Sequence, residues 1–131
     1  MVEISENGVT VYRGSAINRV PHGTGKSFCP FTAAIAYDGN WVDGKWHGVG
    51  WEFNPYTHAV VFKGIYCNGM RHSGVEYNPY TGTVTYEGLF SNGIKSNGTE
   101  FDPDTGNVLK KRFRFQPSTT VPERRKSTDP K

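Results

Sequence analysis

The chain has 131 residues, the size of one domain with little room for a second. Hydrophobic residues make up 35% of it, below the roughly 45 to 50% of typical globular chains, whereas glycine (16 residues) and aromatic residues (14%) are frequent. No apolar run approaches the roughly 18 residues of a membrane span and no secretory leader is visible, so we expect a soluble, intracellular protein without a transmembrane segment.

The charge is distributed unevenly along the chain. The formal net charge is +3, but residues 110–131 carry eight basic and two acidic side chains, and residues 1–109 carry seven basic and ten acidic ones. The sequence therefore predicts a mildly acidic body that ends in a basic tail.

Two sequence patterns alternate along the body of the chain. The first reads FCPFTAAIAY at 28–37, FNPYTHAVVF at 53–62, YNPYTGTVTY at 77–86 and FDPDTGNVLK at 101–110. The second reads YRGSAINRVPHGTG from 12, YDGNWVDGKWHGVG from 37, FKGIYCNGMRHSG from 62 and YEGLFSNGIKSNG from 86. Steps of 25, 25 and 24 residues indicate a tandem repeat with units near 12–36, 37–61, 62–85 and 86–110.

Each unit predicts a β-hairpin. It begins with an aromatic-x-Gly-x-aromatic strand, as at Tyr37, Gly39 and Trp41, where alternation places two rings and a glycine on one face. We expect the glycine to leave room for a ring from the neighbouring strand over bare backbone. Asp43-Gly44, and Asn-Gly in the two later units, then predict a type I′ turn and a return strand.

The return strands are predicted at 48–53, 74–77 and 98–101, and each ends at an Asx-Pro step that favours a second turn. Two strands per unit, joined only by tight turns, predict an antiparallel meander, because a parallel pair needs a long crossover. An additional first strand is possible within residues 3–11, around Asn7-Gly8, and LKKRFRF at 109–115 has the alternation of a terminal strand. We expect an all-β domain over residues 1–115 and a disordered basic tail over 116–131.

The second pattern resembles the MORN repeat, whose consensus runs Tyr-x-Gly-x-Trp-x-x-Gly-x-x-His-Gly-x-Gly. The unit at 37–50 matches at Tyr37, Gly39, Trp41, Gly44, His47, Gly48 and Gly50. The later units match the consensus less well. Tyr66 and Phe90 stand in place of the consensus Trp, Ser73 in place of a Gly, and Ser96 in place of the His. The resemblance covers roughly residues 12–110 and implies an elongated, twisted single sheet of stacked hairpins with a shallow aromatic groove. It also implies a scaffolding role at cytoskeletal or membrane-apposed structures, since the catalytic domains of MORN-containing enzymes lie outside the repeats.

The aromatic positions are the first candidate binding site. A single sheet cannot bury both faces, so we expect rings to serve both as a core and as a groove for a protein segment or for a second copy of the chain. The candidate residues are Tyr37, Trp41, Phe62, Tyr66, Tyr86 and Phe90.

Other recurring polar residues are interpreted as structural. His22, His47 and His72 recur at one position, but equivalent positions two strands apart are about 9.6 Å from each other, too far for a shared zinc ion. Glu52, Glu76 and Glu100 also recur and are expected to pair with basic residues on adjacent strands. Cys29 and Cys67 are expected to be reduced thiols. No catalytic, metal-binding or cofactor-binding motif is visible, so we expect neither an enzyme nor a cofactor.

The basic ending is the second candidate site. Each basic residue near an anionic membrane contributes about 1 kcal/mol, so the tail could favour acidic phospholipid; specific nucleic-acid binding is not expected. The candidate residues are Lys110, Lys111, Arg112, Arg114, Arg124, Arg125 and Lys126. The sequence thus leaves two main hypotheses, a non-catalytic protein-binding or self-associating scaffold, and a module peripheral to acidic membranes. A third, a detached accessory subunit of an enzyme, also stays open.

Overall fold

The computed structural model describes residues 1–113, all of whose regular structure is β-strand. The strands are β1 (Val2–Glu6), β2 (Val9–Ile17), β3 (Val20–Phe28), β4 (Ile35–Val42), β5 (Lys45–Phe53), β6 (Val60–Cys67), β7 (Met70–Tyr77), β8 (Val84–Ser91), β9 (Ile94–Phe101) and β10 (Val108–Phe113). Arg114 and Phe115, predicted to end the last strand, and the predicted tail over 116–131 lie outside the described residues.

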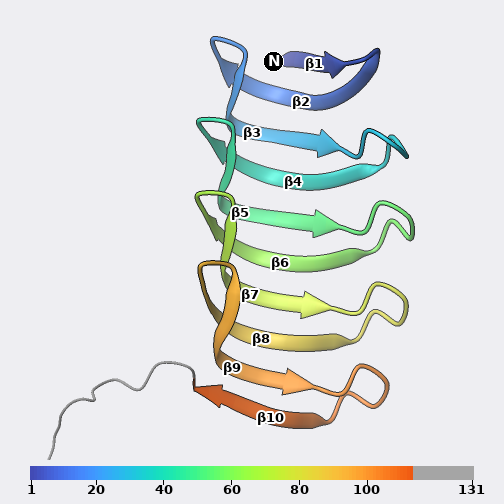
Figure 1. Cartoon of the computed structure of the whole chain (residues 1–131), viewed down its shortest axis with the longest axis vertical. Coiled ribbons are helices and arrows are strands. Elements are labelled where there is room, and N and C mark those ends of the chain that lie inside the picture. The colour runs from blue at the N-terminus through green and yellow to red at the C-terminus, as the bar shows by residue number, and fades with distance from the viewer. Residues whose placement is uncertain (114–131) are drawn as a thin grey trace, which may run out of the picture.

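The ten strands form one open sheet in which the spatial order equals the chain order. Every strand pairs antiparallel with its neighbours in the chain, so the sheet runs as a meander from β1 at the top of Figure 1 to β10 at the bottom. The predicted all-β, single-sheet meander is therefore confirmed. Across residues 1–113 there is no helix long and apolar enough to cross a membrane.

Two-residue turns close the hairpins along one edge of the sheet. Asp43 and Gly44 both have positive φ (51° and 82°), as type I′ geometry requires, and Asn68–Gly69 and Asn92–Gly93 do the same. The additional first strand is also present, with its turn at Asn7–Gly8. The return strands begin three or four residues earlier than predicted, at Lys45, Met70 and Ile94, because pairing resumes directly after a two-residue turn.

The core consists of rings that lie on glycines of the neighbouring strand. Tyr37 on β4 covers Gly50 on β5 so closely that a Cβ at Gly50 would be 2.1 Å from the tyrosine hydroxyl oxygen. Tyr12 covers Gly25, and Tyr86 covers Gly98, in the same way. The ring-on-glycine contact is therefore present, but it lies at the return-strand glycines and not, as expected, at the glycine between two rings. Gly39 lies instead against the backbone of Gly50, where a Cβ would be 2.5 Å from the Gly50 Cα.

These rings also contact each other from β2 to β8. Successive centroids are 5.0 to 5.5 Å apart at interplanar angles of 74° to 89°, an edge-to-face series. In order along the series they are Tyr12, Trp41, Tyr37, Tyr66, Phe62, Phe90 and Tyr86, and all seven are buried. Each such pair contributes about 0.5 to 1.5 kcal/mol beyond its area burial. We call the face that carries them the inner face and the opposite one the outer face.

The strands bend where the rings pack. The pairing register shifts next to the glycines, between Gly39 and Trp41 on β4 and between Gly88 and Phe90 on β8. Such bulges bend a strand and increase its twist, and the hairpin ends visibly turn away from the rest of each strand (Figure 1). The bend lets a single layer enclose the rings on its inner face.

A methyl group at Gly50 tests this packing. Gly50→Ala should lower the free energy of unfolding by about 3 kcal/mol, because the new Cβ overlaps Tyr37 and the site is overpacked. Gly82→Ala is the control: nothing lies within 4 Å of its Cβ position and only the positive φ of 77° opposes the change, at about 1 kcal/mol. Urea denaturation of both variants provides the comparison. Equal losses would contradict the ring-on-glycine contact.

Candidate functional site

The six rings proposed as a groove lie inside the core. Tyr37, Phe62 and Tyr86 have no exposed surface, and Trp41, Tyr66 and Phe90 are also buried. The bent strands and the neighbouring rings cover them, which an unbent sheet would not do. These residues therefore hold the sheet together and offer almost no area to a partner.

The rest of the inner face carries a ladder of charges. Arg71 lies 3.1 Å from Glu52 and 3.0 Å from Glu76, Lys95 lies 3.1 Å from Glu76 and 3.9 Å from Glu100, and Arg112 completes the ladder at 2.6 Å from Glu100. All three glutamates pair with basic residues, but the expected partner on an adjacent strand is present only for Glu100, which pairs with Arg112 on β10. For Glu52 and Glu76 that expectation is wrong, because long cationic side chains reach across the intervening strand, from Arg71 on β7 to Glu52 on β5 and from Lys95 on β9 to Glu76 on β7. Each carboxylate thus has a cationic partner, which suits structural pairing better than acid-base catalysis.

The ladder also contacts the core rings. The guanidinium of Arg71 lies 4.5 Å from the centroid of Phe62, and the Tyr66 hydroxyl donates a hydrogen bond to Glu52 (2.9 Å). Burial raises the pKa of Tyr66 well above its usual value, and the nearby negative charge of Glu52 raises it further. The hydroxyl therefore stays protonated and remains a donor at neutral pH.

Glu76 is the central carboxylate of the ladder. Burial by itself raises the pKa of Glu76, but hydrogen bonds from Thr85 and Lys95, together with the charges of Lys95 and Arg71, outweigh it and hold that pKa below its usual value. The Thr85 hydroxyl donates to the carboxylate at 2.8 Å. The folded state consequently favours the ionised form of Glu76.

The repeated histidines support the turns. His22 Nδ1 accepts a hydrogen bond from the backbone N–H of Asp43 (3.3 Å), and His47 Nδ1 accepts one from Asn68 (3.1 Å). Each ring therefore joins one hairpin to the first turn residue of the next, and His72 lines a pocket together with Asn92 of the following turn. Within residues 1–113 no group of three or more His, Cys, Asp or Glu side chains is placed to hold a metal ion.

The outer face exposes apolar side chains that the sequence-based prediction did not select. Val49 on β5 is paired with Ile65 on β6, and Leu89 follows on β8; their exposed fractions are 56%, 39% and 46%. Trp51, 41% exposed, lies beside Val49 with the Lys63 ammonium 5.0 Å from its ring centroid. The signal was present in the sequence as the positions alternating with the core residues, at Val49-x-Trp51 and Ile65.

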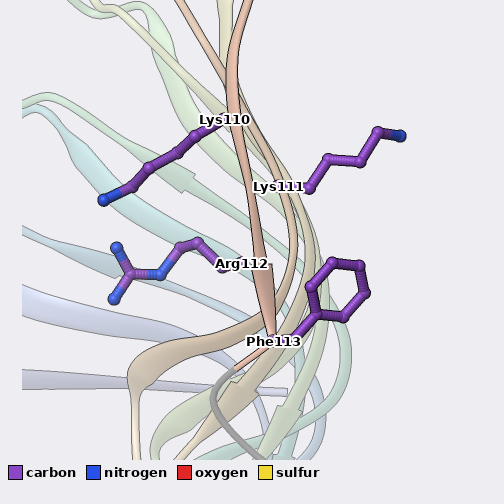
Figure 2. A pocket seen from close by; sticks show the side chains of 4 residues that line it. All are labelled: Lys110, Lys111, Arg112 and Phe113. Atoms are coloured by element: carbon purple, nitrogen blue, oxygen red, sulfur yellow. The ribbon is translucent and has the colours of Figure 1, made fainter.

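The basic candidates do not form one patch. Lys110 and Arg112 project from one side of β10, whereas Lys111 and Phe113 project from the other, around a shallow pocket of about 260 Å³ (Figure 2). Arg112 is paired with Glu100, and none of the described residues forms an ion pair with Lys110 or Lys111. The other candidates, Arg114, Arg124, Arg125 and Lys126, lie outside the described residues.

The pKa of Glu76 implies a specific pH dependence. A carboxyl whose pKa is lowered by folding stabilises the protein above its unfolded pKa of about 4.3, and this contribution is lost as the pH falls through the folded pKa. Glu76→Gln should therefore lower the thermal midpoint at pH 7, and its difference from the unmodified chain should shrink below about pH 4.5. Glu87→Gln, at an exposed carboxylate outside the ladder, is the control. A Glu76→Gln difference that stays constant down to pH 3 would contradict the favoured ionisation.

Comparison of the chain with models of known protein families finds no matching family, and no curated protein shows significant similarity to it.

Proposed function

We propose that the chain is a non-catalytic, intracellular scaffold of MORN type that binds a protein partner. The resemblance of residues 37–50 to the MORN consensus supports the type of repeat. The observation that carries the binding role is the exposed apolar row on the outer face, formed by Val49, Trp51, Ile65 and Leu89. We call these four residues the outer-face row.

Two features favour binding through this row. The outer-face row lies on β5, β6 and β8 of a sheet whose backbone is already rigid through pairing on both sides, with Ser73 of β7 between Ile65 and Leu89. Exposed apolar side chains gathered on one face are typical of interaction sites. Trp51 adds an aromatic anchor with a polar N–H, the type of residue that dominates binding energy in interfaces. The inner face is less suitable, because its rings are buried and its charges are already paired.

A second function, attachment to acidic phospholipid, has narrower support. Lys110 and Lys111 are exposed on the terminal strand β10. They project to opposite sides of that strand (Figure 2), so a flat membrane would meet only one of them at a time. The lipid hypothesis therefore depends mainly on the basic residues beyond 113.

Substitutions in the outer-face row test the scaffold function. Trp51→Ser combined with Ile65→Thr should reduce capture of partner proteins from a cell extract at least tenfold, as expected for an interface anchor worth about 2 kcal/mol. Ile94→Thr, which alters a more exposed apolar residue (53%) directly after a hairpin turn, is the control and should leave capture unchanged. Quantitative mass spectrometry measures capture, and light scattering shows whether the partner is a second copy. Unchanged capture by the folded double variant would contradict the proposed surface.

Vesicle sedimentation tests the lipid function. Binding to acidic vesicles should fall about tenfold when residues 114–131 are removed, and further when salt is raised, because the attraction is electrostatic. Lys110→Glu in the full chain should reduce binding less than the truncation. Binding that survives both the truncation and high salt would contradict a role for the basic ending.

A further inference from the structure

Three aromatic side chains lie fully outside the fold on one edge of the sheet. Phe31, Tyr56 and Tyr80 are 89%, 72% and 79% exposed. They occupy the same position in the loops that join β3 to β4, β5 to β6 and β7 to β8, and these loops stack in a column opposite the two-residue turns (Figure 1). The core rings, the charge ladder and the outer-face row do not involve them. We call these three residues the loop row.

The loops that carry the loop row are held by a repeated set of hydrogen bonds. Asn54 Oδ1 accepts from the backbone N–H groups of Tyr56 (2.8 Å) and Thr57 (3.0 Å), and Asn78 Oδ1 accepts equivalently from Tyr80 (2.8 Å) and Thr81 (3.1 Å). A backbone hydrogen bond closes each of these two loops. The N–H of Asn54 donates to the carbonyl of Ala59 (2.9 Å), and the N–H of Asn78 donates to the carbonyl of Thr83 (2.9 Å). The backbone that carries each ring is thus fixed, so a ligand has to order only the side chain and not the loop.

Neighbouring loops also contact each other. The hydroxyl of Thr81 donates to the carbonyl of Pro103 in the next loop (3.3 Å), and the Thr83 hydroxyl donates to the same oxygen. Equivalent loop positions are two strands apart, which is about 9.6 Å for the usual strand spacing. The backbone positions that carry the loop row therefore recur at a regular interval along the sheet axis.

We propose that the loop row binds a proline-rich segment in the polyproline II conformation. That helix rises about 3.1 Å per residue with three residues per turn, so its pitch of about 9.3 Å matches the interval between the rings. A segment with a proline in every third position would place one turn in each of the two gaps between Phe31, Tyr56 and Tyr80. Aromatic side chains are the usual partners of such segments because the ligand is already extended and ordered.

The polar groups of the loop row suit the same ligand. The carbonyl groups of a polyproline II helix have no internal hydrogen bonds. The hydroxyls of Tyr56 and Tyr80 have no hydrogen-bond partner among residues 1–113, so both can donate to such carbonyls. The fourth loop carries the exposed carboxylate of Asp104 in place of a ring. A lysine or arginine one turn beyond the last proline would meet this charge, which fixes the direction of the segment.

The end of the chain itself fits this description poorly. Its prolines at 117, 122 and 130 are five and eight residues apart, whereas the row requires a spacing of three. The inferred occupant is therefore a separate proline-rich segment with a basic residue. The loop row lies on the loop edge and shares no residue with the outer-face row, so the two sites can be tested independently.

Fluorescence anisotropy with two labelled peptides of equal length tests the proposal on the full chain. The first peptide repeats Pro-Pro-Ala and ends in Arg, and the second repeats Pro-Pro-Ala-Ala and ends in Arg. The first should bind at least about fivefold more tightly, because only its period follows the rings. Tyr56→Ser combined with Tyr80→Ser should weaken binding of the first peptide at least about tenfold without shifting the thermal midpoint, since both side chains are exposed.

Further variants distinguish the loop row from the outer-face row and from nonspecific adhesion of the peptide. Asp104→Asn should weaken the Arg-containing peptide about threefold and leave a peptide ending in Ala unaffected. The Trp51→Ser, Ile65→Thr variant should bind the first peptide as the unmodified chain does. Absence of peptide binding, equal binding of both peptides, or unchanged binding by the tyrosine variant would overturn the proposal. So would tyrosine-dependent binding to phosphatidylcholine vesicles without peptide binding, or a dimer that the tyrosine variant dissociates.

Discussion

The contact between a ring on one strand and a glycine on the next is the constraint on which this protein depends. A one-layer sheet has no second layer to pack against, so its apolar side chains must be covered by the sheet itself. Tyr37 lies against Gly50 at a distance that leaves no space for any other side chain. The glycine thus provides the space for the ring, and the bulge bends the strand around it. Repetition of this unit along the chain joins the rings into a continuous core.

Burying the rings moves the possible binding surfaces elsewhere. Trp46 stacks on Tyr37 with centroids 4.4 Å apart, and the equivalent position becomes Arg71 and then Lys95 toward the C-terminal strands. The inner face therefore changes from aromatic to charged along the sheet, while each cation still lies over a core ring and between glutamates. Such partly buried, mutually paired charges stabilise the stack but leave little for a ligand to bind.

The loop edge combines variable side chains with a constant backbone. Ala33 and His58 adopt the left-handed conformation (φ 64° and 67°) that Gly82 and Gly106 adopt in the later loops. A non-glycine residue in this region costs about 1 kcal/mol. In the first loop Cys29 stands at the Asx position, and hydrogen bonds from the Thr32 side chain and the Phe31 and Thr32 backbones lower its thiol pKa. The loops thus keep one backbone shape even where a non-glycine residue has to adopt the left-handed conformation. Each loop therefore presents an exposed side chain at the same position.

The sequence by itself determined the all-β class, the antiparallel meander and the type I′ turns. These features follow from short spacings, since Asn-Gly turns, alternation and the repeat period act over a few neighbouring residues. Only the tertiary structure decided which rings remain free. Alternation separates two faces of a strand but does not say which one the bend encloses, so Tyr66 became core while Trp51 stayed exposed. The accessible surface depends on bulges whose bend adds up over many strands, and no single unit of the repeat contains that information.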